Sequence, residues 1–175
     1  MNRNLKRLFV GIAAIAVISA LAPIGARADT STLPLQYPWD VKLGASLGTD
    51  NAFKGGLFDA GLDYDFGKTT ANNPVAYGIY GDYTGKSGAS MFGVGVDLKF
   101  MLANAAVVNK PYVGVGIGDY ILHVTGSSSQ DNFGGKVFAG YDFTQQVFGE
   151  VDYDLTSKVD GVNPDAIGVR VGYRF

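Results

Sequence analysis

The chain contains 175 residues, of which 25 are glycine and none is cysteine. The lack of cysteine excludes disulfides and thiolate metal sites, and glycine is about twice as frequent as its usual share of roughly 7%. Residues 1–28 hold four of the 14 basic residues and none of the 16 acidic ones, so the rest of the chain has ten basic residues and a net charge of −6. That charge argues against nucleic acid as a partner.

The first 28 residues have the pattern of a secretory signal peptide. A basic start (Arg3, Lys6 and Arg7) precedes an apolar run over residues 8–22. The motif Ala26-Arg27-Ala28 then matches a cleavage site. The apolar run is too short for a membrane anchor. We therefore predict that residues 1–28 are cleaved and that the mature chain begins at residue 29.

Residues 29–38 contain two prolines and no regular pattern, which predicts a short tail. After this tail, apolar residues alternate with small or polar ones over eight segments, which is the period of a β-strand. The segments recur about every 15–20 residues, the spacing of a strand and its turn. They cover residues 39–48, 57–66, 75–84, 91–100, 112–124, 133–144, 147–155 and 167–175.

The segment over residues 112–124 breaks its own alternation. Its first apolar residues, up to Ile117, share one face, and Asp119 would fall on that same face. A β-bulge near Gly118 would remove the conflict by shifting the alternation by one residue. The residues that such a bulge would turn to the apolar face are Tyr120, Leu122 and Val124.

The last segment ends the chain on an aromatic residue with no polar tail. Its apolar face consists of Ile167, Val169, Val171, Tyr173 and Phe175. An apolar strand left at a sheet edge invites aggregation, whereas a strand that pairs with the first strand closes a barrel and leaves no edge. The sequence therefore predicts an all-β fold, an eight-stranded antiparallel up-and-down transmembrane β-barrel over residues 39–175.

Two features indicate which face of the strands points outward. Aromatic residues of the apolar face gather near both ends of the strands, as in the interfacial belts of a membrane barrel. Glycine gathers on the charged face, where an eight-stranded lumen has room only for side chains. A soluble lipocalin-like barrel, with its apolar face inside, is the alternative. We expect a membrane barrel with a polar lumen filled by side chains.

An even number of strands places both ends of the barrel on one side of the membrane, which in an outer-membrane protein is the periplasm. Residues 29–38 then form a short periplasmic tail, and the periplasmic turns are residues 67–74, 101–110 and 144–146. The outer loops are residues 49–56, 85–90, 125–132 and 156–165, and they are short and polar.

Charged residues on the inward face predict a network of ion pairs, because buried charges are stable only when they are paired. The set is Asp40, Lys42, Asp59, Asp63, Asp82, Asp97, Lys99, Lys136, Asp142, Glu150, Asp152, Asp154, Arg170 and Arg174. For the two arginines on the last strand, the expected neighbours are Glu150, Asp152 and Asp40. Acidic residues outnumber basic ones on this face. The network would either fill the lumen or line a narrow conduit for ions.

The signal peptide, the mature length, the eight segments and the ending Val-Gly-Tyr-Arg-Phe resemble small outer-membrane barrels of the OmpX, OmpA-barrel and opacity-antigen class. The resemblance implies secretion to the outer membrane of a Gram-negative bacterium and contact with its lipid. It also implies that Tyr173 and Phe175 form the signal read by the barrel-assembly machinery. The class includes adhesins, structural anchors and a few lipid enzymes, so the resemblance does not select an activity.

His123 is the only histidine and the first candidate for catalysis. Its surroundings superficially resemble the His-x-Ser pattern of outer-membrane lipid A deacylases, but Thr125 stands in place of the serine. The segment over residues 133–144 offers no glutamate, only Lys136 and Asp142. An acyltransferase could use His123, Asp119 and a loop serine, and it would also need an apolar pocket. Because the constellation is incomplete, we expect no enzyme.

Two pairs of carboxylates share a face, one at Asp63 and Asp65 and the other at Asp152 and Asp154. Each pair provides too few oxygens for calcium, which takes six or more. We therefore expect neither a metal nor another cofactor. The expected function is a structural or surface-interaction role in the cell envelope, with an extracellular ligand of unknown identity as a further partner. A narrow ion pore and a lipid-modifying enzyme that uses His123 are the alternatives.

Overall fold

The computed structural model describes residues 32–33, 37–48, 53–69, 75–102, 111–157 and 164–175. Within these residues the chain forms nine β-strands, and no helix there is long and apolar enough to cross a membrane. The strands are β1 (Thr32–Leu33), β2 (Trp39–Gly48), β3 (Gly55–Thr69), β4 (Val75–Lys86), β5 (Ala89–Met101), β6 (Pro111–Val124), β7 (Gln130–Asp142), β8 (Val147–Thr156) and β9 (Ala166–Arg174). The expected signal peptide lies outside the described residues.

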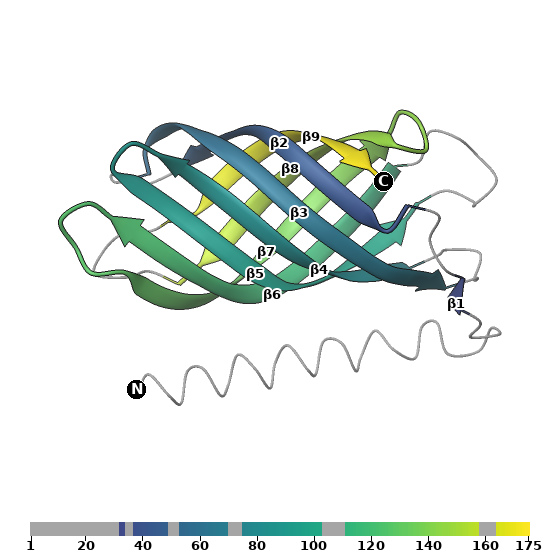
Figure 1. Cartoon of the computed structure of the whole chain (residues 1–175), viewed down its shortest axis with the longest axis horizontal. Coiled ribbons are helices and arrows are strands. Elements are labelled where there is room, and N and C mark those ends of the chain that lie inside the picture. Colours follow the sequence, from purple (N-terminus) through teal and green to yellow (C-terminus); the bar gives the residue numbers. More distant parts are fainter. Residues whose placement is uncertain (1–31, 34–36, 49–52, 70–74, 103–110, 158–163) are drawn as a thin grey trace.

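Strands β2 to β9 form one closed antiparallel barrel. Each of these strands pairs with the next along the chain, and β9 pairs with β2 to complete the ring. The closing register places Val41 opposite Tyr173 and Leu47 opposite Ile167. The strands run obliquely to the long axis of the barrel (Figure 1). The prediction of an eight-stranded up-and-down barrel is confirmed.

The two ends of the barrel differ in what they carry. The terminal end holds the start of β2 and the end of β9, where the backbones of Trp39 and Phe175 exchange hydrogen bonds of 3.2 and 2.9 Å. The opposite end, called the loop end, carries the β4–β5 and β6–β7 hairpins (Figure 1). At the terminal end β1 pairs with β3, with Thr32 opposite Thr69. A two-residue strand thus lies within the expected tail over residues 29–38, because β3 extends past residue 66 and offers backbone groups for pairing.

The outward face of the barrel is apolar along its length. On β9, for example, Val169 and Val171 each expose 62% of their surface. Aromatic rings gather at the terminal end, where the ring of Trp39 lies 4.7 Å from that of Tyr64. Phe58, Tyr83 and Phe92 are exposed nearer the loop end. Because the apolar face is outside, the soluble lipocalin-like alternative is wrong.

The bulge predicted near Gly118 is absent from β6, and that prediction is wrong. β6 keeps an unbroken register against β5, and Asp119 lies opposite Val94. Asp119 is exposed on the outward face, next to Phe133 of β7. Tyr120 and Leu122 point inward and are buried, whereas the bulge would have turned them outward. The lumen near the loop end is apolar, so apolar side chains are stable inside it there.

Several strands also extend further toward the loop end than the sequence predicted. β4 and β5 are joined by only two residues, with Gly88 at a φ of +90°. β7 begins at Gln130, so the expected loops over residues 85–90 and 125–132 are shorter. Among the described residues, the one irregularity in the register of a barrel strand against its neighbour lies in β3, between Asp65 and Gly67.

Inward glycines make room for large aromatic side chains of neighbouring strands. A Cβ atom added to Gly172 would lie 2.0 Å from the ring of Phe148, and one added to Gly140 would lie 2.1 Å from the ring of Tyr112. Real side chains do not approach this closely, so the rings occupy the space above the glycines. This packing explains why glycine is so frequent on the inward face.

We expect Gly172→Ala to lower the free energy of unfolding by about 1–3 kcal/mol, because overpacking forces the Phe148 ring to move. Urea unfolding of refolded protein in detergent measures the loss. Gly81→Ala is the matched control, since the nearest atom to the added Cβ is 3.9 Å away. Equal losses for the two variants would contradict the packing argument.

Candidate functional site

The lumen contains two kinds of filling. From the terminal end to its middle it holds a charged network, together with a terminal cluster of three aromatic residues, Tyr112, Phe138 and Phe148. Near the loop end it holds the loop-end cluster, which is Phe53, Leu57, Ala89, Met91, Tyr120, Leu122 and Ala166. The charged network has ten carboxylates and five basic groups: Asp40, Asp59, Asp63, Asp65, Asp82, Asp97, Asp142, Glu150, Asp152, Asp154, Lys42, Lys99, Lys136, Arg170 and Arg174.

Arg170 on β9 joins three strands through its guanidinium group. Its Nε donates to Asp59 at 3.1 Å, its Nη1 to Asp82 at 2.6 Å and its Nη2 to Asp152 at 3.0 Å. All four side chains are almost fully buried. Asp59 also accepts hydrogen bonds from Ser46 and Thr84. Bonds to three carboxylates use the planar donor fork of arginine, which lysine could not reproduce.

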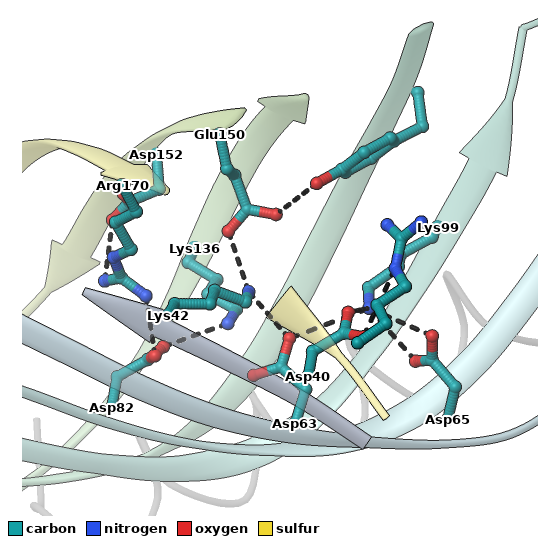
Figure 2. Close-up of polar contacts among 12 residues, drawn as sticks. Asp40, Lys42, Asp63, Asp65, Asp82, Lys99, Lys136, Glu150, Asp152 and Arg170 are labelled. Carbon is teal, nitrogen blue, oxygen red and sulfur yellow. Dashed lines mark hydrogen bonds and ion pairs between the residues drawn. The ribbon is translucent and has the colours of Figure 1, made fainter. Parts of the chain in front are cut away.

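Lys42 on β2 likewise joins carboxylates on other strands. Its Nζ lies 2.6 Å from Asp63 of β3 and donates to Glu150 of β8 at 2.7 Å (Figure 2). The second carboxylate oxygen of Glu150 accepts a hydrogen bond of 2.9 Å from the Tyr112 hydroxyl. Both oxygens of this buried carboxylate are therefore satisfied, as the low dielectric of a lumen requires.

Lys136 on β7 combines an ion pair with an aromatic contact. Its Nζ donates to Asp82 at 2.9 Å and lies 3.6 Å from the centre of the Tyr80 ring. Asp82 on β4 therefore bridges Lys136 on β7 and Arg170 on β9. Such shared carboxylates make the network cooperative, since removing one member leaves several partners unpaired.

The terminal end of the network is built around Lys99 and Arg174. Lys99 contacts Asp40 at 3.1 Å and Asp65 at 3.0 Å (Figure 2). Arg174 contacts Asp40 at 3.2 Å and Asp142 at 2.9 Å. Its guanidinium carbon also lies 4.4 Å from the centre of the Phe148 ring. Arg174 and Asp142 are slightly exposed, so the charged part of the lumen reaches solvent at the terminal end.

Two carboxylates in the lumen depart from this pairing. Neither oxygen of Asp97 has a hydrogen-bond partner among the described residues, although the side chain is buried. Asp154 accepts a long hydrogen bond of 3.4 Å from Tyr120, whose hydroxyl is 3.1 Å from that of Tyr80. The inward face carries more acidic than basic residues, and Asp97 and Asp154 belong to this excess.

The structure places all fourteen residues of the sequence-based network inside the lumen. It brings Arg170 to Asp152 and Arg174 to Asp40, as expected. Glu150 lies opposite Arg170 in the register but contacts Lys42 instead. The residues missing from the expected set are Asp65, Ser46, Thr84, Tyr80, Tyr112 and Tyr120. Asp65 lies on the inward face of the same alternating pattern as Asp63, which was the available signal.

His123 points outward at the loop end of β6 and is exposed. Its Nδ1 lies 3.4 Å from the hydroxyl of Ser129, which faces it across the β6–β7 hairpin. Within the described part of the chain, no carboxylate contacts the other ring nitrogen. Asp119 and Thr125 are exposed, and neither side chain makes a hydrogen bond to the ring. The arrangement provides a histidine and a hydroxyl but no orienting acid.

Of the two acid pairs, Asp63, Asp65 and Asp152 make ion pairs within the charged network. Asp63 and Asp65 both face Lys99, and Asp152 contacts Arg170. Among the residues with described positions, no three acidic or histidine side chains are grouped so that they could hold a metal ion.

Two solved structures similar to this chain are outer-membrane proteins. The outer membrane enzyme PagL has a TM-score of 0.54 and 17% identity, and the match covers 77% of this chain and 98% of PagL. Neisserial surface protein A (NspA) has a TM-score of 0.54 and 18% identity, with 78% and 94% covered. No family model and no curated protein matches the sequence. The chain therefore has the fold of small eight-stranded outer-membrane barrels.

We expect Arg170→Met to lower the free energy of unfolding by about 3–5 kcal/mol, because it leaves buried carboxylates without their partner. Urea unfolding of the refolded barrel in detergent measures this loss. Adding Asp152→Asn should restore part of it, and the double-mutant cycle isolates the coupling between the two residues. Leu155→Ala, on the outward face of β8, is the control for truncating an exposed side chain. If the losses of unfolding free energy from the two substitutions are additive, Arg170 and Asp152 are not coupled.

Proposed function

We propose that the protein is a sealed β-barrel of the bacterial outer membrane with a structural or surface-interaction role. In this proposal the terminal end lies in the periplasm and the loop end faces the outside of the cell. Support comes from the fold, the apolar outward face with aromatic residues near its two ends, and the signal-peptide pattern of residues 1–28. Outer-membrane lipid would cover the outward face.

The sealed state rests on one observation, the loop-end cluster. Phe53 and Tyr120 are fully buried within it, and Met91 and Leu122 are nearly so. Apolar constrictions oppose the passage of ions because water leaves them. Below the cluster, the charged network occupies the lumen with side chains that bind one another. A polar conduit for ions would have to cross both regions.

The wild-type protein in planar bilayers should therefore show no stable open channel. The measurement is single-channel current with protein whose folding is verified by its different gel migration before and after boiling. The pore alternative makes the opposite prediction. It requires steady conduction by wild type, and it requires Arg170→Met to shift ion selectivity without destabilising the barrel. Those two results together would replace the proposed function.

We also propose that Tyr173 and Phe175 form the signal for the barrel-assembly machinery. Both rings are exposed on the outward face at the terminal end. The Tyr173 hydroxyl accepts a hydrogen bond from Gln146, and Phe175 pairs with Trp39 through its backbone only. Neither ring fills the lumen, so a need for aromatic residues here is better explained by recognition than by packing.

Phe175→Ala should lower the amount of protein in the outer membrane much more than it lowers the stability of refolded protein. One ring at the lipid interface contributes only about 1–3 kcal/mol to folding, whereas loss of the signal stops assembly. Blotting of outer-membrane fractions measures the first effect, and urea unfolding measures the second. Phe143→Ala is the matched control, since this ring has similar exposure at the same end. Equal membrane levels of Phe175→Ala and wild type would refute the signal.

We propose no catalytic role for His123. Its contact with Ser129 is at the limit of hydrogen-bond length and open to solvent. A hydrolase of this kind needs a base oriented by a third group, and donors that stabilise the oxyanion. The similarity to PagL concerns the fold, because the two sequences are only 17% identical.

A further inference from the structure

Asp97 on β5 is a buried acid that the charged network leaves without a partner. It exposes only 3% of its surface, and within the described residues neither of its oxygens accepts a hydrogen bond. Lys99, two residues further along β5, instead lies 3.0 Å from Asp65 and 3.1 Å from Asp40. A buried carboxylate is stable only when a positive charge balances it. Asp97 therefore needs a positive charge from outside the chain.

Asp97 shares a row of the barrel wall with Asp65, and one glycine separates the two. Gly78 of β4 lies opposite Asp65 of β3 on one side and opposite Asp97 of β5 on the other. A Cβ atom built on Gly78 would lie 2.6 Å from the carbonyl oxygen of Tyr64, 2.7 Å from Oδ1 of Asp65 and 3.1 Å from Oδ1 of Asp97. Three oxygens, two of them from carboxylates, therefore converge on the inward side of Gly78.

The backbone of β3 is irregular at this same place. Its register against β4 shifts between Asp65 and Gly67. Such irregularities redirect a strand locally and are over-represented next to functional sites. A register shift beside one carboxylate, a glycine that leaves space, and a second carboxylate without a partner thus occur together in one row of the lumen.

The oxygens and the charge around Gly78 determine which ion fits. Carboxylate and carbonyl oxygens suit hard cations. Calcium takes six or more oxygens, and among the described residues no third acidic side chain joins this pair within metal-ligating reach. The ammonium group of Lys99, 3.0 Å from Asp65, also repels a doubly charged ion more strongly than a singly charged one. A small monovalent cation meets both conditions.

We propose that the lumen binds a monovalent cation such as Na⁺ in front of Gly78, between the carboxylates of Asp97 and Asp65. The ion sits further from the backbone than the Cβ atom considered above, and Asp97 turns toward it without breaking a hydrogen bond. It enters from the terminal end, where the side chains of Asp65 and Arg174 are 9% and 13% exposed. The loop-end cluster closes the other end, so the ion is held and not conducted.

The first experiment measures stability against Na⁺ concentration. Refolded protein in detergent is unfolded with urea at neutral pH, and N-methyl-D-glucamine replaces Na⁺ so that the ionic strength stays constant. An ion that binds only the folded state raises the folding equilibrium constant by mass action. For wild type this constant should rise about tenfold for each tenfold increase in Na⁺ above the dissociation constant.

Asp97→Asn keeps the shape of the side chain and removes its charge. Without Na⁺ this variant should be more stable than wild type, because it no longer buries an unbalanced carboxylate. Its stability should not respond to Na⁺, so the difference from wild type shrinks as Na⁺ is added. Asp131→Asn is the matched control. Asp131 is an exposed acid near the start of β7, and its variant should keep the Na⁺ response of wild type.

The second experiment locates the ion directly. Crystals of the protein are soaked in thallium(I) acetate, since Tl⁺ is a monovalent ion with strong anomalous scattering. Wild type should show an anomalous peak between the carboxylates of Asp97 and Asp65, and Asp97→Asn should show none there. This readout holds even if the substitution alters stability for another reason.

Three results would overturn the proposal. Wild type that is insensitive to Na⁺ and as stable as Asp97→Asn carries a proton on Asp97 instead of an ion. Stabilities of the two proteins that rise in parallel with Na⁺ place the ion elsewhere. Wild-type crystals without the Tl⁺ peak have no such site. Steady conduction in planar bilayers would refute the sealed state and leaves these comparisons unaffected, so the two failures are distinguishable.

Discussion

The pairing of β9 with β2 is the interaction on which the rest of the structure depends. In a lipid bilayer every backbone amide and carbonyl group needs a partner within the protein, and this pairing removes the two edges that the sheet would otherwise expose. Closure also creates a lumen that eight strands make too narrow for anything but side chains. The charges, glycines and inward aromatic residues are the filling that this geometry requires.

Within that lumen, charge and packing follow from the same constraint. Cations such as Arg170 and Lys42 reach across to carboxylates on other strands because no solvent is available to them. Aromatic rings such as Phe148 fit only where the adjacent strand presents a glycine. An apolar filling at one end and an ionic filling at the other give the barrel two different ends, even though its outward face is apolar at both.

The sequence was sufficient for the fold because period-two alternation determines which residues share a face. It placed fourteen charges in the lumen and suggested neighbours for the two arginines, but it did not give the other partners, since those depend on the stagger of strands around the barrel. Glu150 contacts Lys42 rather than Arg170 for this reason. The alternation failed at Asp119, because apolar residues lie on both faces of β6 near the loop end. Phe53 carried no signal at all, as it lies outside any alternating segment.

The span of the Arg170 contacts has a consequence for the order of events during folding. Arg170 lies 111 residues from Asp59 and 88 residues from Asp82, and it belongs to the last strand of the barrel. These bonds cannot form while β9 is separate from β2, whatever the state of the other strands. The ion pairs of Arg170 at the centre of the lumen therefore form late in folding. An unfinished barrel holds unpaired acids at its centre, and the final strand both closes the wall and neutralises the interior.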